Sequence, residues 1–335
     1  MKTDPAGAAP FRAEWEGHGA VMLAWPHEAT DWAYMLDDVC RCYRDIVDAL
    51  LRAGERVVIL APEEAALPVF SNPAVKVVNV PTNDTWIRDY GPLTLADGTL
   101  LDFRFNAWGQ KFASNFDNQT TRSLVAAGVI ETPVECHKDF VLEGGSVETD
   151  GRGTLLTTAC CLLAPNRNEP MGRAEVETEL KRRLGVKKVL WLDAEPLAGD
   201  DTDGHIDTIA RMAPDNTIVY TPLPGLKEQL LAFANADGEP FNLVELPMPE
   251  PIADPDDASP LPATYANYLI TDRAVLMPTY GQPLNDELAA GILRCVFPGR
   301  EVIAVDCRAL IRQHCSLHCA TMQVSRNAFA SLFEK

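Results

Sequence analysis

A helix followed by a strand recurs five times along this chain of 335 residues, and this repeat limits the folds that it can adopt. In the first unit the apolar side chains from Val39 to Leu50 follow helical spacing, and an apolar strand follows the helix. From the second unit on, the expected strands recur about every 55–60 residues. The expected helix and strand pairs are 38–51 with 56–60, 121–127 with 134–136, 174–184 with 188–192, 227–235 with 242–246, and 286–296 with 301–306.

Two architectures contain such a repeat. A doubly wound parallel sheet also alternates helices and strands, and it is slightly favoured because it is the commoner fold. Five similar modules of even length instead suggest a closed, pseudo-symmetric α/β ring. No interior linker is long or low in complexity, so we expect one domain over 1–335, with the Pro- and Asp-rich segment 247–262 as a surface loop.

The charge of the chain excludes some partners. With 29 Lys and Arg against 48 Asp and Glu, the net charge is −19, which argues against nucleic acid or an anionic membrane and suits a small cationic substrate. No apolar stretch approaches the roughly 18 residues that span a bilayer. Residues 1–10 lack the features of a signal peptide, so we expect a cytoplasmic protein whose nine cysteines are reduced.

Reactive side chains follow three of the expected strands. The strand at 75–80 leads to NDTWIRD at 83–89, and the strand at 189–192 leads to DDTDGHID at 200–207. The strand at 302–305 leads to His318 and Cys319. In a ring of similar modules these loops would converge at one end of the axis, where loops on a rigid scaffold carry function.

Cys319 is the candidate nucleophile within LIRQHCSLHCA at 310–320. A nucleophilic thiol requires a charged partner and a base within reach. One alternative is an inert buried cysteine, which is the usual state of a free thiol. Another is a metal site formed with His314, Cys315 and His318, although the usual zinc spacing of two residues between cysteines is absent. We expect Cys315 to be a packing residue, with pairing to Cys319 as the alternative.

Two further segments supply an acid–base group and a cation-binding group. His205 and Asp207 would point to the same side of an extended segment, where His205 could act as a general acid and base. Asp89 could receive a cationic substrate against the ring of Trp86, while Arg88 forms structural contacts. The alternatives are a structural histidine with a solvated aspartate, and an internal ion pair of Arg88 beneath a packed tryptophan.

Glu143 precedes a pair of glycines at the end of an apolar run, where the backbone can approach another group closely. A simple hairpin turn is the alternative, and the spacing does not match a phosphate loop. Together the segments offer one thiol, one histidine and the carboxylates of Asp89, Glu143 and Asp207. Several carboxylates around a thiol suit a planar guanidinium, which two acids can hold while sulfur attacks its carbon.

These motifs resemble those of the agmatine deiminase and bacterial-type peptidylarginine deiminase family of the guanidine-modifying superfamily. The resemblance runs nearly end to end and implies a five-bladed α/β propeller, the pentein fold. The motifs are AEWE at 13–16, LAWPH at 23–27, NDTWIRDYGP at 83–92, LEGGS at 142–146, PNRN at 165–168, DTDGHID at 201–207, PTYG at 278–281 and HC at 318–319.

The resemblance implies a role for each matching residue. Cys319 corresponds to the nucleophile and His205 to the general acid and base. Asp89 and Asp207 match the acids that bind the guanidinium, and Glu143 matches the acid that supports the histidine and the guanidinium. Trp86 and Asp201 are expected to contact the substrate. The implied reaction proceeds through a covalent thiouronium on the cysteine, without a metal or organic cofactor.

The chain departs from the agmatine-enzyme pattern at two places, and both departures bear on the substrate rather than on the type of reaction. QHCSL at 313–317 replaces a common GGGNI, and Asp203 stands where many members have asparagine. Hydrolysis of agmatine to N-carbamoylputrescine and ammonia, a step of putrescine synthesis, is the first expectation. Peptidylarginine or another guanidine is the second. Amidino transfer and a non-catalytic binding protein are further alternatives, and we also expect a homodimer.

Overall fold

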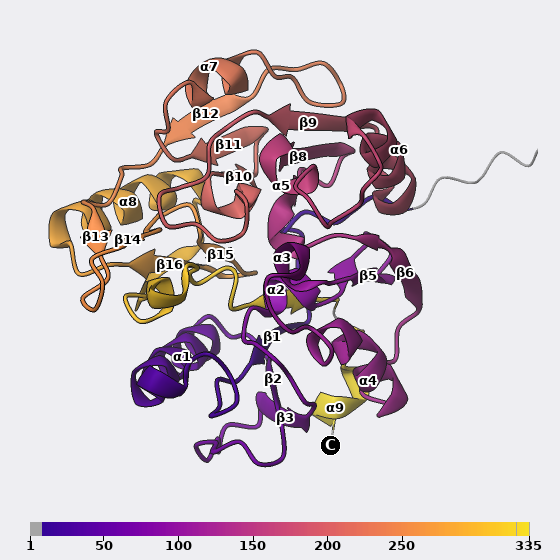
Figure 1. The fold of residues 1–335 in the computed structure, drawn as a ribbon, viewed down its shortest axis with the longest axis vertical. Coiled ribbons are helices and arrows are strands. Elements are labelled where there is room, and N and C mark those ends of the chain that lie inside the picture. Colours follow the sequence, from indigo (N-terminus) through magenta and orange to yellow (C-terminus); the bar gives the residue numbers. More distant parts are fainter. Residues whose placement is uncertain (1–8, 326, 335) are drawn as a thin grey trace, which may run out of the picture.

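Five sheets of three or four strands follow one another around a ring, with helices on the outside (Figure 1). This computed structural model describes residues 9–325 and 327–334, so part of the segment in which we expect no signal peptide lies outside the described residues. The first sheet has the order β18-β1-β2-β3, and the other four have three strands each. The strands of the first sheet are β1 (Ala20–Ala24), β2 (Val57–Ala61), β3 (Val75–Asn79) and β18 (Met322–Val324).

The five sheets share one pairing pattern. In each three-stranded sheet the middle strand pairs antiparallel with one neighbour and parallel with the other, and β1 does the same in the first sheet, where β3 adds a further parallel strand beside β2. The remaining strands are β4 (Leu93–Thr94), β5 (Leu100–Arg104), β6 (Val134–Val141), β7 (Val147–Thr149), β8 (Thr154–Thr158), β9 (Lys188–Leu192), β10 (Ala210–Ala213), β11 (Thr217–Tyr220), β12 (Asn242–Glu245), β15 (Leu269–Ile270), β16 (Ala274–Thr279) and β17 (Glu301–Asp306). Pairing of β18 with β1 joins the two ends of the chain and closes the ring.

One outer helix connects the parallel strands of each module, as a parallel crossover requires. These helices are α1 (Leu36–Arg52), α4 (Thr120–Ala126), α6 (Arg173–Leu184), α7 (Leu226–Leu231) and α8 (Pro283–Val296). Helix α1 forms where we expected a helix. Its apolar side chains at helical spacing from Val39 to Leu50 are buried against the core. Strands β1, β2 and β8 are buried along their whole length, because helices and neighbouring modules cover both faces.

The ring confirms the expected five modules and the five-bladed α/β architecture, and it shows that the doubly wound sheet was the wrong alternative. The fourth helix ends at Leu231 rather than at residue 235. The side chain of Asn235 accepts hydrogen bonds from the backbone of Asp237 and Glu239, so a local turn replaces the last helical turn. The expected loop 247–262 contains a short hairpin of β13 (Ile252–Ala253) and β14 (Pro260–Leu261).

Short helical segments lie toward the centre of the ring, where the modules meet (Figure 1). Helix α2 (Ile87–Tyr90) packs against the 3₁₀ helix η3 (Gly144–Ser146), which in turn packs against η4 (Ile206–Thr208). The other short helices are α3 (Ala107–Gln110), α5 (Ala159–Leu162), α9 (Ala330–Glu334), η1 (Ala33–Met35), η2 (Asp117–Gln119) and η5 (Leu310–Gln313). Within the described residues, every helix is too short or too polar to cross a membrane.

Candidate active site

Gly145 in η3 marks the point where the predicted catalytic side chains meet. A methyl group at this glycine would lie 2.6 Å from Nδ1 of His205, 2.9 Å from Oδ1 of Asp89 and 3.0 Å from Oδ2 of Asp207. The backbone N–H of Gly145 also donates to Oδ1 of Asp89 at 2.9 Å. Three segments that are far apart in sequence therefore surround one backbone position, and only a residue without a side chain leaves room for them.

Asp207 connects this point to the sulfur of Cys319. Oδ2 of Asp207 lies 3.6 Å from Sγ of Cys319 and 2.7 Å from Nδ1 of His318. The amide of Asn267 donates toward the same sulfur, with Nδ2 at 3.4 Å from Sγ. Cys319, Asp207 and Asn267 have no exposed surface. The sulfur thus faces a carboxylate in a region from which bulk water is excluded.

Cys319 forms a disulfide with Cys315 in this structure. Their Cα atoms are 6.4 Å apart, within the range that a disulfide spans. Our expectation that Cys315 only packs was wrong, and the alternative of pairing is the one observed. The four-residue metal alternative is also not formed, because His314 contacts the carbonyl of Gly199 and His318 contacts carboxylates. A thiol of Cys319, and therefore any nucleophilic role, requires the reduced form.

His205 is held in place by its backbone rather than by its ring. Gly204 has a φ of +90°, and a methyl group there would lie 2.7 Å from Sγ of Cys160. The N–H of His205 donates to Oγ1 of Thr202, and η4 begins at the next residue. The segment is therefore not extended through Asp207 as we expected. The side chains of His205 and Asp207 still meet because both point toward Gly145.

Three buried polar atoms at this point lack a hydrogen-bond partner among the described residues. They are Nδ1 and Nε2 of His205 and Oδ1 of Asp207. Nδ1 of His205 is 3.6 Å from Oδ1 of Asp89, which is too long for a hydrogen bond. Buried polar atoms in native proteins almost always have a partner. Their grouping beside Cys319 indicates the place where a polar ligand completes the site.

Asp89 receives its second hydrogen bond from Trp108, a residue that sequence reasoning missed. Nε1 of Trp108 donates to Oδ2 of Asp89 at 3.0 Å. Burial raises the pKa of Asp89, while the nearby imidazole of His205 opposes the shift. Trp108 has a φ of 52°, and its neighbours Ala107 and Gln110 also have positive φ values. Such left-handed backbone costs about 1–3 kcal/mol per residue and often marks a functional site.

Glu143 forms a buried ion pair with Arg167 rather than a direct bond to the histidine. Nε of Arg167 lies 3.1 Å and 3.2 Å from the two carboxylate oxygens of Glu143. The same guanidinium donates to Oδ2 of Asp203 at 2.6 Å. Asp203 stands where many members of the family have asparagine. Its carboxylate therefore balances the charge of Arg167 at the edge of the site. Removing one member of such a buried pair typically costs 3–5 kcal/mol.

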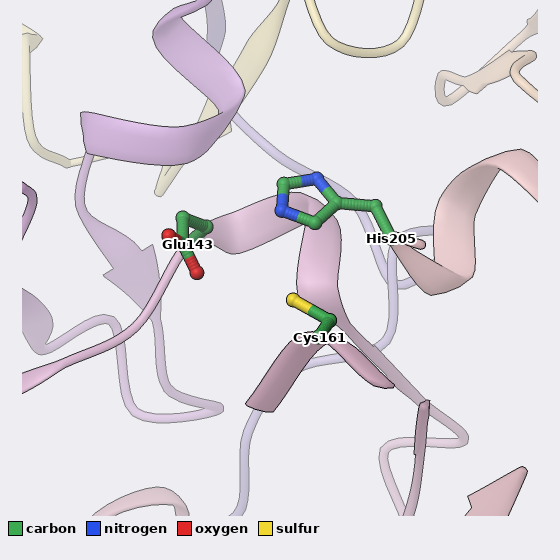
Figure 2. A group of neighbouring side chains, drawn as sticks. All are labelled: Glu143, Cys161 and His205. Carbon is green, nitrogen blue, oxygen red and sulfur yellow. The ribbon is translucent and has the colours of Figure 1, made fainter. Parts of the chain in front are cut away.

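Figure 2 shows Glu143, Cys161 and His205 facing one another from three segments. One ligand-type atom of each lies within 4.8 Å of the others, so the three offer a set that could hold a metal ion. Glu143 is already bound by Arg167, and burial raises the pKa of the Cys161 thiol well above its usual value. A neutral thiol and a carboxylate paired with an arginine favour proton handling by His205 over metal binding.

A cavity of about 450 Å³ borders the site at Asp89. Trp86, Asp89 and Asp201 line it, and their contact with a substrate stays a prediction. Trp86 is almost fully buried and packs against Trp32, with their ring centroids 5.8 Å apart. The remaining aromatic and acidic residues in the wall are Tyr34, Trp108, Phe112, Asp31 and Asp84. An aromatic cavity with carboxylates in its wall suits an extended cation.

Among the described residues that line the cavity there is one arginine, Arg312, and it already has partners. Nε of Arg312 donates to Asp254 at 2.7 Å, and Nη2 of the same guanidinium donates to Asp256 at 2.5 Å. The guanidinium also lies over the ring of Tyr34, 5.7 Å from the centroid. Because two carboxylates already bind it, Arg312 is poorly placed to bind the carboxylate of a substrate.

His318 links the site to a second group of charges that the sequence did not reveal. Its Nε2 lies 2.8 Å from Oε2 of Glu14, and Glu14 in turn accepts from Arg211 at 2.7 Å. Nε of Arg211 also donates to Glu148 at 2.5 Å. Burial would raise the pKa of Asp207, but its hydrogen bond to His318 and nearby positive charges lower that pKa. Asp207 is thus held as a carboxylate.

Comparison with known proteins identifies the family of this chain. The family described as Porphyromonas-type peptidyl-arginine deiminase matches residues 10–325. An agmatine deiminase of Stutzerimonas stutzeri is 30% identical, with 93% of this chain and 94% of the relative covered. The structure of C. jejuni agmatine deiminase with substrate bound, a cysteine-to-serine variant, is 34% identical, with a TM-score of 0.84 over 95% of this chain and 96% of that one.

A Porphyromonas gingivalis structure, provisionally named an arginine deiminase, is 46% identical, with a TM-score of 0.88 over 96% of this chain and all of that one. These similarities run nearly the full length of each chain and include all five modules. The family match itself spans every segment that contributes to the site, from Glu14 to Cys319. The chain therefore belongs to the Porphyromonas-type peptidyl-arginine deiminase family.

Proposed function

We propose that this protein is a hydrolase of C–N bonds in guanidines, and that its substrate is agmatine. The observation that carries the proposal is the meeting of His205, Asp89 and Asp207 at Gly145, beside the sulfur of Cys319. A guanidinium supplies planar N–H donors for the free Oδ1 of Asp207. Its central carbon would then lie near the sulfur, once Cys319 is reduced.

The chemistry follows from these positions. The thiolate of Cys319 attacks the guanidinium carbon, and a C–S bond forms. His205 gives a proton to the departing nitrogen, the C–N bond breaks, and ammonia leaves. A thiouronium remains on the sulfur. His205 next removes a proton from water, the resulting hydroxide attacks the same carbon, and the C–S bond breaks to release a urea-type product and the thiolate.

Asp89, Asp207 and Glu143 have different tasks in this proposal. Asp207 and Asp89 bind the guanidinium, and Asp207 does so in its charged form because its pKa is lowered. Glu143 lies close to His205 and, through its pair with Arg167, keeps that side of the site near neutral. The proposal assigns no metal or organic cofactor to these steps.

The wall of the cavity supports agmatine over free arginine. Asp31, Asp84 and Asp201 line it, and a carboxylate-bearing substrate would meet these acids, while Arg312, the arginine among the described wall residues, is already paired with Asp254. Agmatine carries an ammonium at the same end and would be attracted. Peptidylarginine is the second candidate, since the family description and the 46% identical structure both point to arginine substrates. Assembly as a homodimer and a cytoplasmic location stay predictions.

The test compares agmatine, free arginine and an arginyl peptide, each with the wild-type protein and with Cys319→Ala. Dithiothreitol is present throughout, because the disulfide must be open. We expect ammonia and N-carbamoylputrescine from agmatine, with activity lost in the variant by at least about 10³-fold. Preference for the peptide would move the assignment to peptide citrullination. Turnover by Cys319→Ala equal to that of the wild type would contradict the proposed nucleophile.

A further inference from the structure

The disulfide between Cys315 and Cys319 borders the cavity through Cys315. Cys315 lines the cavity together with Trp86 and Asp89, whereas Cys319 has no exposed surface. Cys315 is therefore the half of the disulfide that contacts the cavity. In this state the sulfur of Cys319 is chemically blocked.

We propose that Cys315 and Cys319 form a reversible oxidation site, at which a hydroperoxide oxidises Cys319 and Cys315 then closes a disulfide that stops the enzyme. This inference rests on the proposed function, since it takes Cys319 as the nucleophile. It adds a modification site and a second cysteine to that function.

The chain holds Cys315 close to Cys319 by contacts on both sides. Before it, Arg312 is bound by Asp254, and His314 adopts a left-handed backbone with its Nδ1 2.8 Å from the carbonyl oxygen of Gly199. After it, Oγ of Ser316 is 3.1 Å from the hydroxyl of Tyr280. A segment fixed in this way keeps the second sulfur near the first, so little ordering is needed to form the bond.

The oxidation balances with a hydroperoxide as the only oxidant. The Cys319 thiolate attacks one peroxide oxygen, an S–O bond forms and the O–O bond breaks, which gives a sulfenic acid and, after protonation, water or an alcohol. Cys315 then attacks the Cys319 sulfur, the S–S bond forms, and the S–O bond breaks to release water. A dithiol reverses the change by exchange, and its own two sulfurs end as a disulfide.

The other described cysteines provide the controls. Cys161 and Cys307 are fully buried, and burial raises the pKa of each thiol well above the usual value. Cys136 on β6 is exposed, and hydrogen bonds from the backbone of Lys138 and from Arg122 lower the pKa of its thiol. Cys136 is therefore the strongest competing target for peroxide, although it lies outside the cavity. Cys136→Ser tests whether oxidation elsewhere explains any loss of activity.

The experiment measures agmatine hydrolysis of the reduced full-length protein before hydrogen peroxide, after it, and after later addition of dithiothreitol. We expect the wild type and Cys136→Ser to lose activity by about tenfold or more and to regain it with dithiothreitol. Cys315→Ser, compared with its own untreated activity, should lose activity without full recovery, because the sulfenic acid is not resolved and oxidises further. The tryptic peptide that begins at Gln313 carries both cysteines, and after peroxide it should be lighter by two hydrogens.

Two results would overturn the inference. One is a wild-type peptide without the internal disulfide after peroxide has stopped the enzyme. The other is a Cys315→Ser protein that dithiothreitol restores as fully as the wild type. Failure of the proposed function gives a different result, since the reduced wild type would then leave agmatine unchanged while the peptide mass still reported the disulfide.

Discussion

Two histidines lie near Asp207, and they differ in their hydrogen-bond partners. His205 has two ring nitrogens without a hydrogen-bond partner in the described part of the chain. His318 has both ring nitrogens within 2.8 Å of a carboxylate oxygen, with Asp207 on one side and Glu14 on the other. Both side chains are buried, so the difference lies in the partners and not in access to water.

This difference separates a reacting group from a supporting group. The proposed reacting group is Asp89, His205, Asp207 and Cys319, and three polar atoms of His205 and Asp207 have no hydrogen-bond partner among the described residues. The supporting group is Glu14, Glu148, Arg211 and His318, where each charge already has a partner. Buried polar groups are costly unless they are bonded, so unbonded ones indicate the position of the substrate and bonded ones indicate fixed geometry.

The largest expected effect comes from replacing the reacting histidine. His205→Asn keeps a polar side chain but can neither give nor take a proton at neutral pH, so kcat for agmatine should fall by about 10²–10⁴-fold. The melting temperature should change little, because no described residue bonds the ring. His137→Asn is the matched control, since His137 is buried on β6 beside Arg183 and away from the site. A His205→Asn enzyme with more than a tenth of wild-type kcat would place the proton transfer elsewhere.

A methyl group at Gly145, where the side chains of the proposed reacting group meet, should have the next largest effect on activity. Gly145→Ala would put a carbon 2.6 Å from Nδ1 of His205 and 2.9 Å from Oδ1 of Asp89, so these side chains must move. We expect kcat/KM to fall by about 10²-fold, as for a small misplacement of reacting groups. Gly291→Ala is the control, because it lies in α8 with open space around it and should leave activity unchanged. Wild-type kinetics in Gly145→Ala would show that the reacting group does not need this geometry.

Replacing His318, the supporting histidine, should lower activity less and stability more than replacing His205 does. His318→Leu leaves Glu14 and Asp207 without their shared partner, and losing a hydrogen bond to a charged group costs about 1.5–3 kcal/mol. We expect a lower melting temperature and a fall in kcat/KM of about 10–100-fold. His318→Gln, which can still donate to Asp207, should recover part of the activity. Equal losses in both variants would mean that packing alone, and not the bond to Asp207, is what His318 provides.

The motifs made the reacting group predictable from the sequence, but they did not reveal the supporting group. Asp89, His205 and Asp207 each stand in a short polar segment after a strand, and a repeated module brings such segments together. Glu14 and Arg211 are 197 positions apart, and no local pattern connects them. Their contact depends on how the ring closes, which the pairing of β18 with β1 decides.

Two other features of the structure could not be predicted from the sequence, because they depend on local backbone contacts. The role of Trp108 depends on a left-handed turn at residues 107–110, for which Gly109 is the only sign in the sequence. The fourth helix is shorter than its apolar pattern predicts, because the side chain of Asn235 bonds the backbone of a turn instead. In both places a backbone conformation determined by a few contacts overrides the periodicity from which we read the rest of the fold.

Removing one hydrogen bond to the reacting group should have a smaller effect than the changes above. Trp108→Phe keeps an aromatic wall but loses the donor to Oδ2 of Asp89. A hydrogen bond to a charged acceptor contributes about 1.5–3 kcal/mol, although water that enters the cavity can replace part of it. We expect KM for agmatine to rise by about five- to tenfold with little change in kcat. A change confined to kcat would mean that Trp108 acts on the reaction step rather than on binding.

The smallest effect concerns the pH dependence of KM, which we attribute to Asp84 in the wall of the cavity. Burial raises the pKa of Asp84 to about 7, and the charges of Asp31 and Asp89 add to the shift. Asp84 is therefore neutral below pH 7 and charged above it, and only the charged form attracts the ammonium of agmatine. KM for agmatine should be a few-fold lower at pH 8 than at pH 6, corresponding to about 0.5–1 kcal/mol. In Asp84→Asn this dependence of KM should disappear, while the pH dependence of kcat, which belongs to the reacting group, stays. If KM of the variant still fell with pH as in the wild type, the ammonium of agmatine would lie beyond the reach of Asp84.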